Sequence, residues 1–341
     1  MQMDKNRFFG TIYGQAIGDA LGLGSEFMTQ DEVKMFYPDG LSSYDQIVQD
    51  DHRCRWKKGS WTDDTDMMLC IMDAVIANNG AVDLLSIAAN FKKWFNGTPL
   101  GIGRHTYNVL CMEDYEKDPI KNAEMMWTLY RKRSAANGGV MRTSVVGLVK
   151  DDVEKNAENI CLLTHPDRRC VCSAVIVSKI INQLVYHNHE LTYDEIVRCA
   201  EKYDSRALAF LEIAKNADDI SELQLDGLDL GYTLKTLSAA LWALWHCKSF
   251  EEGLLAVVNA GGDTDTNAAV ACSLLGAKYG YDSIPDCFIQ GLNNRELIHE
   301  KMESLWSIMS KIMGLQAGAT PIVVENVDEF LKQMGAVKAM R

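Results

Sequence analysis

Proline and β-branched alternation are both scarce in this sequence. Six prolines occur among 341 residues, and none interrupts a strong helical run. Apolar residues recur instead at helical spacing along most of the chain. These absences argue against a fold built on sheets, so we predict an all-α protein. No low-complexity segment or linker divides the chain, and we expect a single domain over residues 1–341.

Basic side chains are also in deficit, with 34 against 47 acidic ones and a formal net charge of -13. This balance argues against a general nucleic-acid or anionic-membrane surface, although a local basic patch beside a site is compatible with it. The N-terminal stretch MQMDKNRFFGTIYG lacks the apolar core of a signal peptide. We find no apolar run near the roughly 18 residues that cross a bilayer.

The ten cysteines include no C-x-x-C pair. Cys170 and Cys172 stand close together, but alone they give only a weak zinc signal. Most of the others lie in apolar stretches, where a thiol behaves as a small hydrophobic group. We therefore expect reduced thiols and a cytoplasmic protein.

Helical periodicity predicts helices over 6–23, 62–79, 81–96, 104–115, 120–130, 139–149, 151–163, 166–187, 192–201, 206–216, 233–247, 249–258, 264–279, 282–289, 294–313 and 325–334. Pro119, Pro166 and Pro285 lie near predicted helix starts, where proline is tolerated. Residues 28–60 form the longest irregular stretch, and a loop of that length is usually functional or mobile. Because it ends at a cluster of acidic residues, we expect it to cover a site.

Four glycines, Gly10, Gly14, Gly18 and Gly22, recur at four-residue intervals in the first predicted helix. Each costs roughly 1 kcal/mol of helix stability relative to alanine, so their shared face needs an explanation. Close approach of another helix is the favoured interpretation. Close approach of a ligand to the backbone is the alternative.

The segment GSWTDDTDMM places Asp63, Asp64 and Asp66 within four positions behind Thr62, directly before an apolar helix. Helix capping explains one or two such acids, with Thr62 or Asp63 as the N-cap, because the helix dipole favours negative charge there. Capping alone does not explain why a similar arrangement recurs 200 residues later.

That second arrangement is NAGGDTDTNAAVACSLLGAKYG, in which a glycine turn precedes Asp263, Asp265 and Thr266 and an apolar helix follows. If the two helix starts face each other, their carboxylates repel unless a counter-charge is present. A donor set of oxygens without histidine or cysteine suits Mg²⁺ or Mn²⁺ and disfavours zinc, and the spacing does not match an EF-hand. Four aspartates would balance two divalent ions, so we predict a binuclear metal site at helix N-termini.

Six stretches resemble motifs of the ADP-ribosylglycohydrolase family, in family order: GQAIGDALGLGSEF, GSWTDDTDMM, NGGVMRTSVVGL, THPD, GYTLKTLSAALWAL and NAGGDTDTNAAVACSLLGAKYG. The pairing of TDDT with GGDTDTN is the most specific part of this resemblance, which spans residues 10–280. It implies a single-domain orthogonal multi-helix bundle with two Mg²⁺ or Mn²⁺ ions. It also implies hydrolysis of the bond between C1″ of ADP-ribose and an acceptor.

The resemblance assigns metal ligands by motif position: Thr62, Asp63, Asp64, Asp263, Asp265 and Thr266. Asp66 lies outside the family pattern, where capping or a supporting role fits better. Glu26, in GSEF, matches an acid that in some members contacts metal or gates the site, and a surface acid is its plain alternative.

Substrate contacts are implied in the same way. Asn137, Gly138 and Gly139 match a loop that binds ribose and phosphates, where glycine lets backbone N–H groups approach oxygen atoms. His165 resembles a histidine near the ADP-ribose, and Tyr232 resembles an aromatic residue that lies against the substrate. A plain turn, a structural histidine and core packing are the respective alternatives.

The chain departs from the family at Gly101-Ile102-Gly103, where arginine-directed bacterial members often carry an acid in a D-I-G pattern. The missing acid puts arginine specificity in doubt and is compatible with other acceptors. We include Gly101 and Gly103 among the candidate substrate contacts.

The resulting hypothesis is metal-assisted glycoside hydrolysis acting on an ADP-ribosylated protein or a small ADP-ribose conjugate. A bound divalent ion lowers the pKa of water, and Asp63, Asp64, Glu26 and Asp263 are the candidate catalytic groups. Two alternatives remain open: an ADP-ribose-binding module without turnover, and a two-metal phosphohydrolase. The sequence does not choose the acceptor, the metal or the oligomeric state.

Overall fold

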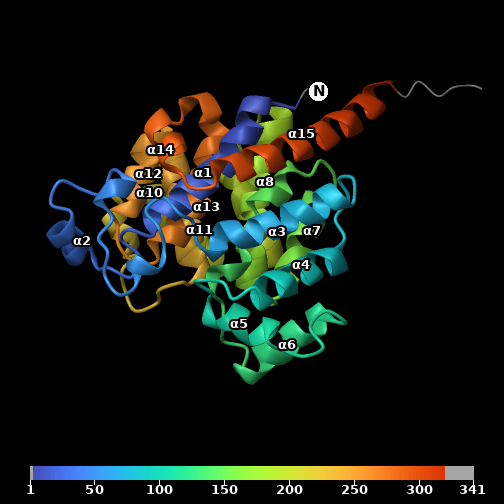
Figure 1. Ribbon diagram of the computed structural model, residues 1–341, viewed down its shortest axis with the longest axis horizontal. Coiled ribbons are helices and arrows are strands. Elements are labelled where there is room, and N and C mark those ends of the chain that lie inside the picture. The colour runs from blue at the N-terminus through green and yellow to red at the C-terminus, as the bar shows by residue number, and fades with distance from the viewer. Residues whose placement is uncertain (1–2, 319–341) are drawn as a thin grey trace, which may run out of the picture.

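Helices α1 (Lys5–Gly22) and α13 (Thr264–Tyr279) lie side by side at the centre of the computed structural model, which describes residues 3–318 (Figure 1). A Cβ atom added at Gly14 or Gly18 would clash with backbone carbonyl groups of α13. The glycines therefore allow the two backbones to touch. Of the two interpretations of their spacing, close helix packing is confirmed.

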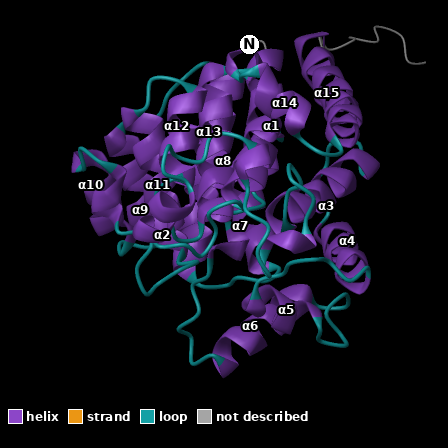
Figure 2. Cartoon of the chain, turned by 60° about the vertical axis from the view of Figure 1, so that its left-hand side comes forward, coloured by secondary structure: helices purple, strands orange, loops and turns teal. Residues whose placement is uncertain are grey.

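The other α-helices surround this pair: α2 (Gln30–Phe36), α3 (Asp63–Ala77), α4 (Leu84–Asn96), α5 (Arg104–Leu110), α6 (Pro119–Leu129), α7 (Val153–Leu162), α8 (Arg168–His187), α9 (Tyr193–Tyr203), α10 (Ala207–Asn216), α11 (Thr233–His246), α12 (Phe250–Val258), α14 (Asp286–Gly291) and α15 (Arg295–Gly318). Between residues 3 and 318 the only β feature is an isolated bridge from Ala136 to Tyr232, and Figure 2 shows helices joined by loops. The all-α prediction is confirmed. Buried side chains from α1 to α15 form one hydrophobic cluster, as expected of one domain.

The stretch 28–60 is less irregular than we expected. Its first part forms α2, because Thr29 and Glu32 make a capping box in which the Thr29 N–H and hydroxyl both donate to the Glu32 carboxylate, at 2.8 and 2.9 Å. Two short 3₁₀ turns, Tyr44–Gln46 and Arg53–Arg55, follow. The prediction of a wholly irregular segment is therefore wrong at its start.

The predicted helix over 139–149 is also wrong, because the segment contains only 3₁₀ turns, at Asn137–Gly139 and Ser144–Leu148. The segment is buried, and side chains of α1 and α8 bond its carbonyl groups. Gln15 donates to the Met141 carbonyl at 3.0 Å, and Ser178 donates to that of Thr143 at 2.9 Å. These bonds replace the i to i+4 bonds of an α-helix.

Two further differences concern helix ends and hydropathy. The predicted helix 282–289 divides into a 3₁₀ turn and α14, because Pro285 lacks the N–H needed to continue a helix and instead stands at the α14 N-cap. Helix α8 is long and apolar enough to cross a membrane by length and composition, but 83% of its apolar stretch is buried inside the protein, as in a core helix. The predicted helix 325–334 lies outside the described residues.

Candidate metal centre

The N-terminal ends of α3 and α13 open into a cavity of about 630 Å³. Both acidic clusters line it, so the structure brings together stretches 200 residues apart. The predicted site residues on its wall are Glu26, Thr62, Asp63, Asp64, Gly101, Gly103, Asn137, Gly138, His165, Asp263, Asp265 and Thr266. Gly139 and Tyr232 lie outside this lining.

The start of α13 is placed by the turn at Gly261 and Gly262, both with positive φ, at 73° and 88°. The turn pairs with the loop after α1: Phe27 N–H donates to the Gly262 carbonyl and Gly262 N–H to the Met28 carbonyl, both at 2.7 Å. A Cβ at Gly261 would stand 2.6 Å from the Met28 carbonyl oxygen. Two glycines are thus required for the loop carrying Glu26 to lie against the second acidic cluster.

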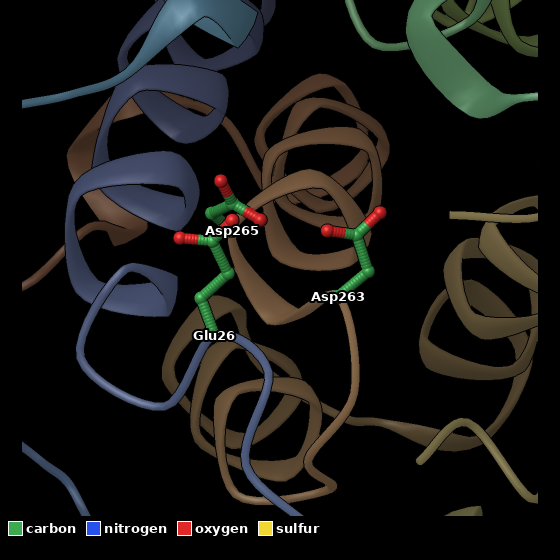
Figure 3. Close-up of side chains that lie close together, drawn as sticks. All are labelled: Glu26, Asp263 and Asp265. Atoms are coloured by element: carbon green, nitrogen blue, oxygen red, sulfur yellow. The ribbon is translucent and has the colours of Figure 1, made fainter. Parts of the chain in front are cut away.

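Glu26, Asp263 and Asp265 form a close group of carboxylates. One oxygen from each can be chosen so that all three lie within 4.8 Å of one another. Figure 3 shows the Glu26 and Asp265 carboxylates side by side, with Asp263 facing them from the loop before the helix. Burial, and then the nearby Glu26 charge, raises the pKa of Asp263 to about 6 and the pKa of Asp265 well above its usual range.

Asp63 and Asp64 enter from the first turn of α3. Burial raises the pKa of Asp63 to about 7, partly opposed by the Gly103 N–H, which donates to its Oδ2 at 3.3 Å. Burial also raises the pKa of Asp64, helped by the neighbouring aspartate charges. The Asp64 Oδ1 atom is buried and has no hydrogen-bond partner among the described residues.

These residues fit a hard divalent cation. Every donor atom in the group is an oxygen, the carboxylates approach one another closely, and one buried carboxylate oxygen lacks a partner. Two hydroxyls stand on the same wall, from Thr62 and Thr266. A cation would supply counter-charge to carboxylates whose pKa values are raised by burial and by their negatively charged neighbours.

Asp19 is a sixth acid at this site, which our sequence reasoning did not identify. It is fully buried in α1, and its carboxylate caps α3: the backbone N–H groups of Thr62 and Thr65 donate to it at 2.9 and 3.0 Å, and both hydroxyls add further bonds. Thr62 is the N-cap residue but makes no side-chain cap bond of its own. The signal for Asp19 was its being the one acid within the glycine-spaced helix α1.

Asp66 has a supporting role. Its two carboxylate oxygens accept hydrogen bonds from the indole N–H groups of Trp61 and Trp94, at 2.8 and 3.0 Å. It therefore fixes two aromatic side chains behind α3 and does not cap that helix.

Asn137 and Gly138, from the loop before Gly139, line the cavity next to Asp263. The Asn137 amide donates to Asp263 Oδ2 at 2.6 Å and to the Thr236 hydroxyl at 3.0 Å, so it orients one of the acids. Gly138 faces the cavity beside His165. A Cβ at Gly139 would lie 2.7 Å from the Cys161 sulfur, so that glycine packs beneath the wall.

Tyr232 stands behind this loop. Its ring packs edge-on against Phe210, with centroids 5.5 Å apart, and the Arg169 guanidinium lies 5.5 Å from the ring centroid. Asp167 in turn bonds Arg169 at 2.8 Å. A direct contact between Tyr232 and a ligand stays a prediction.

The end of the 28–60 segment supplies further cavity residues that sequence reasoning missed. His52 Nε2 and Glu26 Oε2 form a hydrogen bond of 2.6 Å, and the His52 ring packs against Trp56. A Cβ at Gly101 would lie 3.0 Å from the Trp56 ring and 3.6 Å from Asp63 Oδ1. The Trp56 ring thus borders the space where a side chain at Gly101 would lie.

Comparison with known proteins identifies similar chains. A family model described as ADP-ribosylglycohydrolase matches residues 1–316. ADP-ribosylarginine hydrolase Tri1 of Serratia proteamaculans (strain 568) is 26% identical over 310 residues, covering 87% of this chain and 78% of that protein. ADP-ribosylhydrolase ARH3 of Danio rerio is 26% identical over 328 residues, covering 82% and 84%.

A third relative is the ADP-ribosyl-(dinitrogen reductase) glycohydrolase of Rhodospirillum rubrum, 25% identical over 292 residues, covering 84% of this chain and 90% of that protein. A solved structure described as an ADP-ribosylglycohydrolase-related protein complex superposes with a TM-score of 0.68 at 24% identity. It covers 89% of this chain and 98% of that one, which confirms the fold.

Proposed function

This chain belongs to the ADP-ribosylglycohydrolase family, and we propose that it is a divalent-metal-dependent hydrolase that cleaves the bond at C1″ of ADP-ribose. The product would be free ADP-ribose, released from a modified protein side chain or a small conjugate. One observation carries the metal dependence: three chain segments bring five carboxylates to one wall, four of them buried and that of Asp63 half-buried, and one buried oxygen there has no partner among the described residues. The relatives are ADP-ribosyl hydrolases, which supports the reaction class.

We assign the metal to six residues: Thr62, Asp63, Asp64, Asp263, Asp265 and Thr266. A pair of divalent ions, Mg²⁺ or Mn²⁺, would supply Lewis-acid chemistry and counter-charge there. Hydrogen bonds within the chain hold these candidate ligands in position. Asp19 fixes the first turn of α3, and Asn137 fixes the Asp263 carboxylate.

Glu26 differs from the aspartates because it comes from a loop and its side chain bonds only to His52 among the described residues. That contact offers a route for a proton from the Glu26 carboxylate to the imidazole. We therefore favour Glu26 as the group that takes a proton from the attacking water, with His52 holding it in place.

The rest of the cavity suits the rest of the ligand. A volume of about 630 Å³ is in the usual range for small-molecule sites, and the lining also includes Gly138, His165 and the exposed Arg104. Phe27, His52 and Trp56 also line the cavity and pack against one another, with the His52 ring between the other two. We expect the wall formed by Trp56 and Gly101 to set the acceptor, because it borders Asp63.

The cell compartment remains a proposal. We infer a reducing compartment, the cytoplasm, and the ten free cysteines support it.

The test is release of free ADP-ribose from ADP-ribosyl-arginine protein, ADP-ribosyl-serine peptide and O-acetyl-ADP-ribose, with Mg²⁺, with Mn²⁺ and with EDTA. We expect release from at least one linkage that EDTA abolishes. An Asp263→Asn, Asp265→Asn double variant should lose it, whereas Asp218→Asn, at an exposed acid outside the cavity, should retain it. AMP and ribose phosphate as products would instead indicate a phosphohydrolase, and binding without any product would indicate a binding module.

A further inference from the structure

Arg142 is a fully buried cation without a carboxylate partner among the described side chains. Its Nη2 donates to the Thr164 hydroxyl at 2.6 Å and to the Ile160 carbonyl at 3.3 Å, and its guanidinium lies 4.6 Å from the centroid of the Phe91 ring. Burying an unpaired charge is costly, so its presence beneath the cavity needs a reason. Arg142 and Thr164 belong to the NGGVMR and THPD stretches, and the proposed function assigns neither a role.

The bonds of the Thr164 hydroxyl determine which nitrogen of His165 carries hydrogen. Arginine is always a donor, so the hydroxyl oxygen accepts from Arg142. Its single hydrogen then goes to His165 Nδ1, which lies 2.7 Å away. Nδ1 is therefore an acceptor, and the hydrogen of the neutral ring is on Nε2.

The alternative assignments leave groups unsatisfied. If His165 donated from Nδ1, the Thr164 hydroxyl would receive two donors, and no acceptor for its own hydrogen is found among the described residues. A doubly protonated ring would add a charge beside Arg142. Burial, the neighbouring His105 and Arg142 all lower the pKa of His165, in agreement with a neutral ring.

The same threonine orients the second histidine of the pair. His105 Nε2 donates to the Thr164 carbonyl at 2.9 Å, and His105 Nδ1 accepts from the Ser134 hydroxyl at 3.0 Å. The His105 and His165 rings pack with their centroids 4.6 Å apart. Both nitrogens of His105 are thus occupied.

His165 Nε2, in contrast, is buried and has no partner among the described residues. It stands on the cavity wall beside Gly138, where an added Cβ would lie 2.9 Å from Nε2 and 3.0 Å from the Thr106 hydroxyl. A larger residue at position 138 would therefore crowd this nitrogen. The cavity wall therefore carries an unused N–H donor.

We propose that Arg142 and Thr164 are positioning residues that hold His165 as a neutral Nε2–H donor to a negatively charged oxygen of the ligand, such as one in its diphosphate. This deepens the proposed function and rests on it for the identity of the ligand. The threonine sets the tautomer, and the buried guanidinium fixes the threonine hydroxyl. The positive charge of the guanidinium also favours a negatively charged ligand oxygen next to Nε2. A donor that needs no protonation keeps working above neutral pH.

The first test is the tautomer itself, measured by long-range ¹H–¹⁵N NMR on the full chain with ¹⁵N-labelled histidine. The His165 signals are assigned by their absence in a His165→Gln variant. We expect the shift of a hydrogen-bearing nitrogen at Nε2 and of a bare nitrogen at Nδ1. Hydrogen on Nδ1, or on both nitrogens, would overturn the proposal without any variant.

Variants then test the two positioning residues. Thr164→Val, which keeps the shape and removes the hydroxyl, should shift the tautomer signals and weaken ADP-ribose binding by roughly tenfold or more in calorimetry. Thr164→Ser should restore both properties. Arg142→Met should give a mixture of tautomers. Thr11→Val, at a buried threonine that bonds within α1, is the matched control and should change neither property.

The proposed function and the positioning role can be refuted separately. If the wild-type ring has the expected tautomer but the protein binds no ADP-ribose, the proposed function is wrong and the positioning role stands. If Thr164→Val keeps both the wild-type tautomer and the wild-type affinity, the positioning role is wrong, whatever the reaction.

Discussion

The carboxylate of Asp19, in α1, accepts two hydrogen bonds of 2.9 Å from Thr62, one from its backbone N–H and one from its hydroxyl. Thr62 is the N-cap of α3, the helix that carries Asp63 and Asp64. An acid from one helix thus caps another helix and fixes its first turn, where the candidate metal ligands stand. The candidate ligands depend on α1 although α1 supplies none of them.

Replacing Asp19 by Asn should destabilise the protein by about 2 kcal/mol or more, because an amide accepts at one atom only and leaves buried N–H groups unpaired. The free energy of unfolding should be measured with urea at pH 8, since burial raises the pKa of Asp19 to about 7. Asp4→Asn, at the exposed cap of α1, should cost less than about 1 kcal/mol. Equal effects at both caps would contradict the prediction.

The close contact between α1 and α13 predicts how two glycine variants change the stability of the protein. Gly18→Ala forces a methyl group against the α13 backbone and should lower the free energy of unfolding by about 2 kcal/mol or more. Gly314→Ala, at an exposed position of α15 with open space around it, should be neutral or stabilising by up to about 1 kcal/mol. Thermal and urea unfolding of the two variants measure these changes. An unchanged free energy of unfolding in Gly18→Ala would refute the close contact.

Divalent cations should stabilise the protein, and more strongly as pH rises. Burial raises the pKa of Asp63 to about 7 and that of Asp263 to about 6, from 3.8, so between these values the native state holds protons that the unfolded chain has released. Stability without metal should therefore fall as pH rises from 4 to 7. Cations bind the ionised carboxylates, so the rise in Tm with Mg²⁺ or Mn²⁺ should be larger at pH 8 than at pH 5.5. At a hundredfold excess over Kd, the cation should raise the free energy of unfolding by about 2.7 kcal/mol.

The matched variant for this experiment is Asp263→Asn, Asp265→Asn. It should abolish the cation-induced rise in Tm and reduce the loss of stability with pH. A rise that survives in the variant would place the cation elsewhere on the protein.

His165 should make the opposite contribution to the pH dependence. Its folded pKa lies well below 6.5, so as pH falls below 6.5 the unfolded state takes up a proton that the native state refuses, and stability is lost. The slope is at most about 1.4 kcal/mol per pH unit for one such group. His165→Gln should flatten the curve between pH 6.5 and 5 relative to wild type. His187→Gln, at an exposed position, should leave the curve unchanged, and an unchanged curve for both would show that His165 is not buried as a neutral ring.

The sequence by itself determined the fold class, the donor atoms of the candidate metal centre and the glycine-lined helix face that another group approaches. Each of these depends on local chemistry. Periodicity gives helices, Gly14 and Gly18 mark a face that backbone can approach, and Asp63 and Asp263 each begin a helix. Local pattern also explains why most predicted helices lie within a few residues of their observed positions.

Only the tertiary structure decided the rest, because the partners are distant in sequence and their register is set by packing. Asp19 reaches Thr62 only because α1 crosses the start of α3, and Glu26 reaches the aspartates only through the Gly262 turn. Residues 139–149 lack an α-helix because side chains of other helices bond their carbonyl groups. The position of the hydrogen on His165 depends on the hydroxyl of its sequence neighbour Thr164. That hydroxyl donates to His165 because it already accepts from Arg142, a buried arginine from another segment of the chain.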